Sequence, residues 1–556
     1  MDFRLKSCQR KGIINAIAAV VHAMKPFKLF VGVSRTVATL VALLAPAGFC
    51  LHAATLDYIG VPLLRTVTTN LNGAGIRVAQ VEGVDADGSP PHFEVNPAHS
   101  QVNQPTNLFT YHSSLGDATN YANSVGVESF HADGVAQFFF GLPNGVATNV
   151  SQVDNYEAQH FVDTYIFAAS PPDPGAKIIN QSFTFGPQTV PSQQSIDSAY
   201  DDVAAQYGTL YVSGAGNTNA VETPATCYNG LGVAAYLGVS SFGPTPDNGR
   251  CKPDITAPGA ATSYSTPHVA GGAAVLRQAG LRGDGGSDTN SAVDMRTLKA
   301  LLLNGAVKLN NWTNTPSSPL DKRYGAGVLN VFNSYMQLAG GKHTAIESAN
   351  VTTNSAHPPG SNLANIGALS GWNFSSLTSS SANDRVSHFY FNVTNGLSNV
   401  LFTVTATLTW NRQTNQTAIN DLDLFLYNTA TSNLIAQSIS GVDNVEHIYT
   451  NVPPGRYDLQ VWKAGGNAAN GNVTASETYA LAWEIFALPL TITTSNANAV
   501  VTWPIYPTGF SLQATPSLTG PTWTTLYLVR TIANGTNRVE VPLNSSNQFF
   551  RLLRPD

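Results

Sequence analysis

Charged side chains are scarce in this sequence of 556 residues, because Asp, Glu, Lys and Arg together make up only 11% of it. An average globular chain contains about 25%. The formal net charge is −6, and the body of the chain contains no cluster of basic residues. A protein that binds nucleic acid needs a concentrated positive surface. The composition therefore argues against nucleic acid as a partner.

Long apolar runs are missing as well. The longest lies near the N-terminus, from Val37 to Phe49, and basic residues precede it. A membrane-spanning helix needs about 20 apolar residues, so this run is too short to be one. A basic stretch, a short apolar run and small residues in that order are typical of an export signal. We expect residues 1–54 to be a targeting segment, and the mature protein to be secreted and free of the membrane.

Cysteine is rare, with four in the chain. Cys8 and Cys50 lie in the targeting segment, which leaves Cys227 and Cys251. An exported protein can form disulfides, and an even pair is what a single bridge needs. The alternative is two buried thiols, and the cysteine count alone leaves both open.

Strands alternate with helices after residue 76. We expect strands at 76–81, 177–182, 209–213 and 231–239, a helix at 196–207, and a loop that enters a helix at 125–141. This alternation predicts an α/β fold with a doubly wound parallel sheet. In such sheets the chemistry lies at the carboxyl ends of the strands. Glu82, Ser182 and Asn217 all fall at or just past such ends.

The stretch 261–271, Ala-Thr-Ser-Tyr-Ser-Thr-Pro-His-Val-Ala-Gly, reads as the beginning of a helix. Thr262 and Ser263 are residue types that favour the N-cap. The positive end of the helix dipole and the unpaired N–H groups there favour a developing negative charge. Such a position suits a nucleophilic hydroxyl, although an ordinary N-cap serine is the simpler alternative.

The whole stretch resembles the nucleophile motif of the subtilisin-like serine peptidases, the subtilases. Further segments resemble other motifs of that family, in its chain order of acid, His and Ser, and cover roughly residues 70–340. These segments are Ile76–Gly83, His131–Gln137, Gly145–Asn149, Ile179–Phe183, Ser213–Asn217, Ser240–Gly259, Leu298–Val307 and Tyr324–Asn330.

The resemblance implies a role for each matching residue. Ser263 is the nucleophile, His131 its base, and Glu82 the triad acid where the family has aspartate. Asn217 is the oxyanion donor. The segments that line the substrate contain Ser182, Phe183, Gly214, Ala215 and Gly216.

At the level of the whole protein, the resemblance implies a secreted serine endopeptidase, monomeric, acting on protein or peptide substrates without a cofactor for its chemistry. It also implies a disulfide between Cys227 and Cys251, since the matching loops approach each other in the family. Four other carboxylates are rivals of Glu82 for the triad: Asp85, Asp87, Glu128 and Asp133.

The sequence departs from the family pattern at several points. Gly134 and Gln137 replace a histidine and a glycine of the histidine motif, and only Ala260 and Ala261 separate Gly259 from Thr262. Two alternatives therefore remain open: a catalytically degenerate subtilase fold that only binds, and an esterase or amidase that uses the same triad.

The composition changes near residue 343. Residues 344–384 are rich in Ser, Asn, Gly and Pro and are predicted to be a linker. Short alternating runs from 386 to 486 predict an antiparallel β-sandwich. Asp421 and Asp423 share one face of a strand there, so they are a candidate site for structural Ca²⁺, the alternative being a solvated face. We expect a catalytic domain at 55–342, a linker and sandwich at 343–490, and a third β module at 491–556.

Overall fold

A computed structural model of the chain describes residues 6–7, 55–85, 88–142, 144–351, 367–394, 400–466, 471–543 and 547–554. By its internal contacts the chain divides into two units. The first comprises Met1–Asp247 and Thr256–Gln278, and the second comprises Asn248–Ile255 and Ala279–Asp556.

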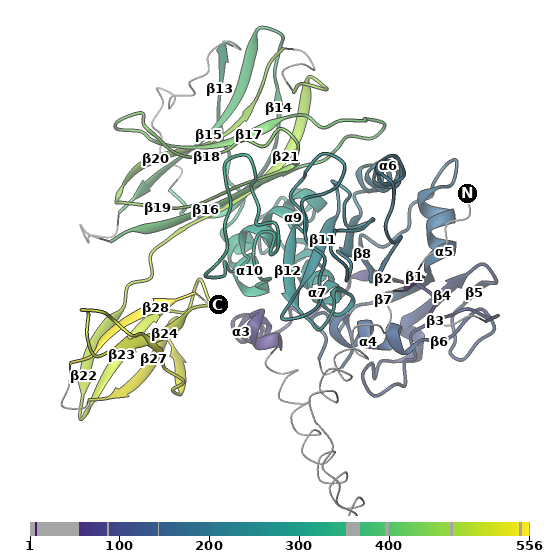
Figure 1. Ribbon diagram of the computed structural model, residues 1–556, viewed down its shortest axis with the longest axis horizontal. Coiled ribbons are helices and arrows are strands. Elements are labelled where there is room, and N and C mark those ends of the chain that lie inside the picture. The colour runs from purple at the N-terminus through teal and green to yellow at the C-terminus, as the bar shows by residue number, and fades with distance from the viewer. Residues whose placement is uncertain are drawn as a thin grey trace, which may run out of the picture. The chain divides into compact units, whose positions relative to one another are not determined.

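The first unit is built on an eight-stranded sheet (Figure 1). In spatial order its strands are β12 (Ile255–Pro258), β11 (Leu231–Tyr236), β10 (Leu210–Gly214), β8 (Ile178–Gln181), β2 (Arg77–Glu82), β7 (Gln152–Glu157), β4 (Phe109–Ser113) and β5 (Gly116–Ala118). The pairs β10–β11, β8–β10, β2–β8, β2–β7 and β4–β7 are parallel. The apolar runs of β8, β10 and β11 are buried along their whole length, as a parallel sheet covered on both faces requires. The predicted doubly wound sheet is confirmed.

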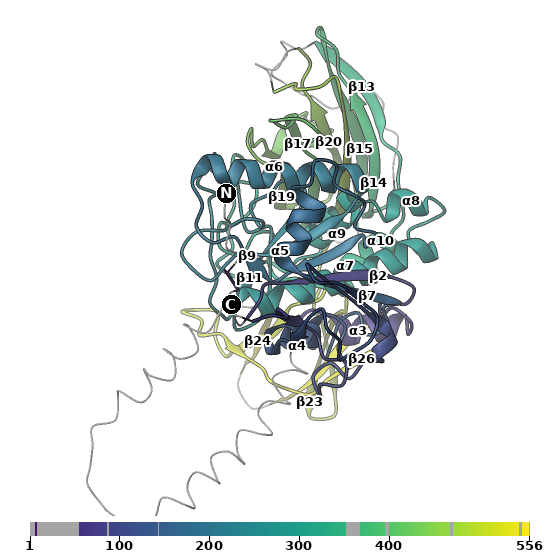
Figure 2. The same cartoon turned by 90° about the vertical axis from the view of Figure 1, so that its right-hand side faces the viewer.

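Helices lie on both faces of this sheet. They are α3 (Val61–Val67), α4 (Phe130–Phe139), α5 (Ala158–Phe161), η2 (Val162–Ile166), α6 (Val190–Tyr207) and most of α7 (Thr262–Arg282), with a short η1 at Thr106–Leu108. Figures 1 and 2 both show α6 on the opposite side of the sheet from α4. Helix α6 begins six residues before the predicted start, because Thr189 caps it and Pro191 is tolerated in a first turn.

Strand β7 was not predicted, because its sequence Gln-Val-Asp-Asn-Tyr-Glu is mostly polar. It lies in the middle of the sheet, where side-chain hydrogen bonds satisfy its buried polar groups. Asp154 accepts from Arg77 Nε at 2.6 Å, and Asn155 Oδ1 accepts from the backbone N–H of Val95 at 2.8 Å. The alternation of polar and apolar residues therefore gives no signal for this strand, although it is central.

Two small strand pairs flank the main sheet. β3 (His92–Glu94) runs parallel to β6 (Val127–Glu128). β1 (Lys6–Ser7) runs antiparallel to β9 (Phe183–Thr184). β1 lies within the predicted targeting segment, and the rest of residues 1–54 is outside the described part of the chain. The targeting segment stays a prediction.

The second unit contains the predicted β-sandwich. One antiparallel sheet has the order β13 (Ile346–Val351), β15 (Asn383–Val393), β20 (Gly455–Lys463), β17 (Leu422–Asn428) and β18 (Leu434–Ser438). The other has the order β14 (Ser370–Thr378), β21 (Ser476–Phe486), β16 (Phe402–Trp410) and β19 (Val445–Val452). Side chains of both sheets, such as Leu424 and Leu408, form one core. Strands β13 and β14 fall inside 344–384, so that stretch is not only a linker.

The last module is also all-β. Its sheets are β22 (Thr491–Ser495), β23 (Asn498–Pro504), β27 (Thr536–Pro542) and β26 (Arg530–Ala533), and β25 (Thr524–Thr525), β24 (Ser511–Thr515) and β28 (Phe549–Leu553). The second unit also holds α8 (Thr289–Ala292), α9 (Met295–Asn304) and α10 (Val331–Ala339). Asn304 at the end of α9 accepts from Thr405 and Thr407 of β16, so these helices belong with the sandwich by contact.

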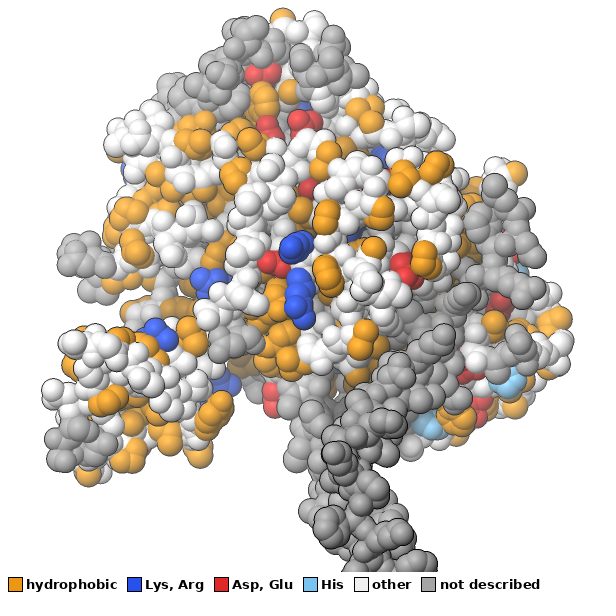
Figure 3. Space-filling model, viewed as in Figure 1, with side chains coloured by type: hydrophobic (Ala, Val, Ile, Leu, Met, Phe, Trp, Pro, Cys, Tyr) orange, Lys and Arg blue, Asp and Glu red, His pale blue; other side chains and the backbone are white. Residues whose placement is uncertain are grey.

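The surface reflects the scarcity of charge. On the face in Figure 3, basic and acidic side chains are few and scattered among polar and apolar ones. Within the part of the chain that the structure describes, no helix is long and apolar enough to cross a membrane.

Candidate active site

Glu82 ends strand β2 and is fully buried. Its Oε2 lies 2.8 Å from Nδ1 of His131. Its Oε1 accepts a hydrogen bond of 2.8 Å from Nε2 of Gln80, which also donates to the carbonyl of Ala132 at 2.9 Å. Gln80 thus ties the carboxylate to the helix that carries the histidine. Gln80 was not predicted from the sequence. The one feature that could have indicated it is its position two residues before Glu82, which puts both polar side chains on the same face of the strand.

The rival carboxylates have other hydrogen-bond donors. Asp85 accepts from Ser129 Oγ at 2.6 Å, Asp133 from the backbone N–H of Asn96 at 2.8 Å, and Glu128 from the hydroxyl of Tyr121 at 3.2 Å. Asp87 lies outside the described residues. The carboxylate hydrogen-bonded to His131 is therefore that of Glu82.

His131 is the second residue of α4, whose N-cap is Ser129. Burial alone lowers the pKa of His131, but the carboxylates of Glu82 and Asp85 outweigh it, so the net pKa is raised above its ordinary value. The other ring nitrogen, Nε2, is buried and makes no hydrogen bond in the described structure. The Nδ1 side of the imidazole thus contacts a carboxylate, and Nε2 is available to accept a proton.

Ser263 is the second residue of α7 and is 2% exposed. Its carbonyl accepts from Ser182 Oγ at 3.0 Å, and its own Oγ lies 3.5 Å from the carbonyl of Ser182. The hydroxyl is therefore directed to Ser182 in this structure and makes no hydrogen bond to His131. Such contacts are often long or unmade without substrate, and one rotation about χ1 redirects Oγ.

Asn217 follows β10 and caps the helix that carries Ser263. Its side-chain oxygen accepts from the backbone N–H of Thr262 at 3.0 Å and from the Thr262 hydroxyl at 3.1 Å. A backbone N–H can only donate, so the atom that faces it is Oδ1, and the Nδ2 group points elsewhere. No described group accepts a hydrogen bond from Nδ2, which leaves the amide as a donor beside the start of α7.

Of the five predicted substrate-lining residues, Ser182 and Gly214 contact the start of α7. Ser182 and Phe183 lie at the junction of β8 and β9, and both are buried. A Cβ at Gly214 would lie 3.2 Å from the hydroxyls of Thr262 and Thr266, so only glycine allows this approach without displacement. Gly216 has φ +100°, which favours glycine. The buried Ala215 lies between them.

The departures from the family pattern have structural reasons. A Cβ at Gly134 would lie 2.9 Å from the ring of Tyr264, so the absence of a larger residue there lets α4 and α7 pack closely. Gln137 accepts from Gln101 at 2.8 Å. The short segment before Thr262 is fixed by a hydrogen bond of 3.0 Å from the backbone N–H of Val239 to the carbonyl of Ala260.

The two residues of the predicted disulfide, Cys227 and Cys251, are both buried and are not joined in this structure. The Cys227 sulfur faces Gly230, where a Cβ would lie 2.8 Å from it. The backbone N–H of Cys251 donates to Asp443 at 2.7 Å, and burial raises the pKa of the Cys251 thiol. Each cysteine is thus held in place by contacts of its own unit.

We expect thiol titration of a chain starting at residue 55 to find two reactive groups after denaturation without reductant. In the native protein both should react slowly, because they are buried and the thiolate is the reactive form. A denatured, unreduced chain with no reactive thiol would show that the bridge forms after all.

The candidate calcium residues lie where β17 begins, and Asp423 is buried. Burial raises the pKa of both Asp421 and Asp423, that of Asp421 to about 6. Within the described residues they do not belong to a group of three ligand side chains whose ligand atoms lie within 4.8 Å of one another. Calcium binding at this position stays a prediction.

Two of three comparisons with known proteins found similar ones. Residues 132–327 match the model of the subtilase family, Peptidase_S8. The match contains Asn217 and Ser263 and begins one residue after His131. The comparison with curated proteins found no match.

Solved structures that resemble the chain include three peptidases. The prenylagaramide maturation protease PagA is 20% identical over 51% of this chain and 99% of its own, with a TM-score of 0.35. A serine protease of Aeromonas sobria is 14% identical over 87% of this chain and 89% of its own, with a TM-score of 0.34. Tripeptidyl peptidase 2 is 14% identical over 70% of this chain and 47% of its own, with a TM-score of 0.30.

The family match and the sequence motifs agree on the same part of the chain. The match spans the parallel-sheet region from α4 to the segment that follows α9. Residues 132–327 thus match the subtilase family of serine peptidases, and the matched range includes two of the candidate site residues.

Proposed function

We propose that the protein is a secreted endopeptidase that cleaves peptide bonds with Ser263 as nucleophile, His131 as general base and Glu82 as the triad acid. The observation that carries the proposal is the 2.8 Å contact between Glu82 and Nδ1 of His131, with Nε2 left without a partner. A carboxylate at Nδ1 fixes the tautomer whose Nε2 can accept a proton. The dyad is thus arranged for general base catalysis.

In the proposed reaction, Ser263 Oγ turns from Ser182 toward Nε2 of His131 and attacks the scissile carbonyl carbon. His131 takes the hydroxyl proton, and Glu82 stabilises the imidazolium that results. The carbonyl oxygen becomes an oxyanion, for which Nδ2 of Asn217 and the backbone N–H of Ser263 are the proposed donors. His131 then returns the proton to the leaving amine, and water hydrolyses the acyl-enzyme by the same steps. These groups supply the chemistry without a cofactor.

The strand beside Ser263 favours a peptide substrate over a small ester, because a peptide can pair with its backbone. Strand β9 follows Ser182 directly, and it already pairs antiparallel with Lys6–Ser7. An extended peptide can add to such a segment through main-chain hydrogen bonds. This is the recognition that a peptidase needs and that an esterase does not.

A fluorophosphonate probe tests the function directly. We expect it to label Ser263, as located by mass spectrometry of the labelled peptide, and to block hydrolysis of casein. Hydrolysis of p-nitrophenyl esters without any of casein would favour the esterase alternative. Absence of both labelling and hydrolysis in folded protein would favour a fold that only binds.

Replacing Asn217 tests the oxyanion donor. We expect Asn217→Asp to lower kcat by roughly 10²–10³ with little change in KM, since a carboxylate lacks the N–H donors. The same carboxylate can still accept from Thr262, so the cap of α7 and the Tm should be kept. Steady-state kinetics and thermal unfolding measured together distinguish a lost donor from a lost cap. An unchanged kcat would remove Asn217 from the mechanism.

A further inference from the structure

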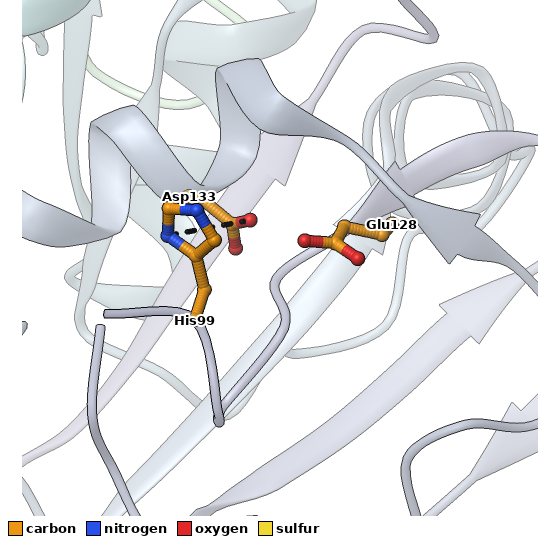
Figure 4. Close-up of side chains that lie close together, drawn as sticks. All are labelled: His99, Glu128 and Asp133. Atoms are coloured by element: carbon orange, nitrogen blue, oxygen red, sulfur yellow. Dashed lines mark ion pairs between the residues drawn. The ribbon is translucent and has the colours of Figure 1, made fainter. Parts of the chain in front are cut away.

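A second cluster of ligand-type side chains lies beside the proposed triad but is not part of it. His99 is in the turn after β3, Glu128 ends β6, and Asp133 is in the first turn of α4. One ligand atom from each lies within 4.8 Å of the others. Figure 4 shows the carboxylates of Glu128 and Asp133 turned toward each other, with the ring of His99 beside Asp133.

Asp133 is the most informative member of this cluster. Its side chain is fully buried, and its Oδ1 accepts from the backbone N–H of Asn96 at 2.8 Å. Its Oδ2 is buried and makes no hydrogen bond, although it lies 3.9 Å from Nδ1 of His99. A buried carboxylate oxygen without a donor is costly unless something positive or protonated faces it.

The surroundings supply negative charge and no fixed positive charge. Glu94 lies opposite Glu128 in the β3–β6 pair, and both of its carboxylate oxygens are buried without a hydrogen bond. Among the described residues, no Lys or Arg forms an ion pair with Glu94, Glu128 or Asp133. The cluster therefore lacks a balancing cation or holds a shared proton.

His99 decides which kind of cation fits. Its Nδ1 lies 3.4 Å from the backbone N of Gln101 and 3.9 Å from Oδ2 of Asp133, so a neutral ring would exchange the long Gln101 contact for the ion to offer Nδ1 as a ligand. One imidazole nitrogen with two carboxylates suits Zn²⁺ and similar transition metals, whereas Ca²⁺ and Mg²⁺ prefer oxygen alone. Tetrahedral Zn²⁺ ligands lie about 3.3 Å apart, so the three groups need to close by about 1 Å or somewhat more.

We propose that His99, Glu128 and Asp133 form a binding site for one divalent transition-metal ion, with Zn²⁺ as the fitting case. The ion would join the turn after β3 to the first turn of α4, and so brace the helix that carries His131 two residues before Asp133. The site is independent of the proposed peptidase chemistry, since none of its ligands is a triad residue. It can therefore be tested in the Ser263→Ala variant, which also prevents self-digestion.

The test is calorimetric titration of the full chain with Zn²⁺ after removal of metals by EDTA and dialysis. We expect one ion per chain, and an affinity lower by at least roughly tenfold in both Asp133→Asn and His99→Gln, since losing even an outer partner of a metal ligand costs about 10–100-fold. Asp163→Asn, which removes an exposed carboxylate of η2, is the matched control and should bind as the parent does. Co²⁺ in place of Zn²⁺ should give visible absorption bands that both ligand variants lose.

Three outcomes would overturn the proposal. Zinc binding that is unchanged in both ligand variants would place the ion elsewhere on the chain. No binding at all in folded parent protein would mean that the carboxylates share a proton instead. If Ca²⁺ binds as tightly as Zn²⁺, and its affinity is unchanged in His99→Gln, the site uses oxygen ligands alone. Because His99 is only half-buried, His99→Gln keeps the test decisive if Asp133→Asn does not fold.

Discussion

Replacing Ser263 with alanine is expected to lower kcat by about 10⁶-fold with little change in KM, the size of effect measured when a subtilisin loses its nucleophile. The change removes one oxygen atom from a buried side chain at the start of α7, so the fold should persist. Assays on casein and on a short peptide, with thermal unfolding as the check on folding, measure the effect.

The loss should also be non-additive. Ser263→Ala, His131→Ala and the double variant should have nearly the same residual rate, because each removes the same attack step. The matched control is Ser265→Ala, two residues further along α7, whose hydroxyl makes only a long contact of 3.4 Å to the carbonyl of Ala261. It should stay within a few-fold of the parent. Hydrolysis by Ser263→Ala at the parent rate would end the peptidase mechanism proposed above.

Replacing Glu82 with glutamine is expected to lower kcat by about 10⁴-fold, as for the corresponding change in another Ser-His-acid triad. The reason lies in Gln80, whose Nε2 donates to Oε1 of Glu82. In the variant this donor orients the oxygen of the new amide toward Gln80, which turns its NH₂ toward Nδ1 of His131. The imidazole must then accept at Nδ1 and carry its proton on Nε2, where it cannot act as a base.

The pH profile separates this effect from simple misfolding. His131 must be neutral to accept a proton, so activity falls as the pH decreases through its pKa, which lies above the ordinary value because of Glu82 and Asp85 despite burial. Without the Glu82 charge, the acidic limb of kcat/KM should move to lower pH. Glu82→Asp should keep part of the activity and a limb like that of the parent.

Glu157→Gln is the matched control for Glu82, since the two residues are aligned in the β2–β7 pair. Glu157 accepts from the backbone N–H groups of Gln159 and His160, which an amide oxygen can also do. The control should therefore keep its activity. If Glu82→Gln behaves as the parent while Asp85→Asn is inactive, the assignment of the acid is wrong.

The sequence pattern predicted the parallel-sheet fold of the first unit, and the resemblance to subtilases supplied the roles of the candidate site residues. Glu82 lies at a strand end, Asn217 lies shortly after one, and Ser263 lies at a helix start. The local sequence pattern predicts all three positions. The side chains that meet there come from segments that the parallel topology brings to one edge of the sheet. The sequence also predicted the antiparallel β-sandwich from the apolar alternation of residues 386–486.

Tertiary structure alone decided what depends on partners far apart in the sequence. The polar strand β7 is stable in the sheet because Arg77 and Val95 satisfy Asp154 and Asn155. The number of cysteines suggested a pair. In the folded chain, Cys227 packs against Gly230 and Cys251 donates to Asp443, and neither contact can be inferred from the number of cysteines. His99, Glu128 and Asp133 share no motif, and they meet because a turn, a strand end and a helix start converge. Local propensity and periodicity predict the helix or strand to which a residue belongs. The hydrogen bonds and charge interactions between elements depend on which elements meet in the folded chain.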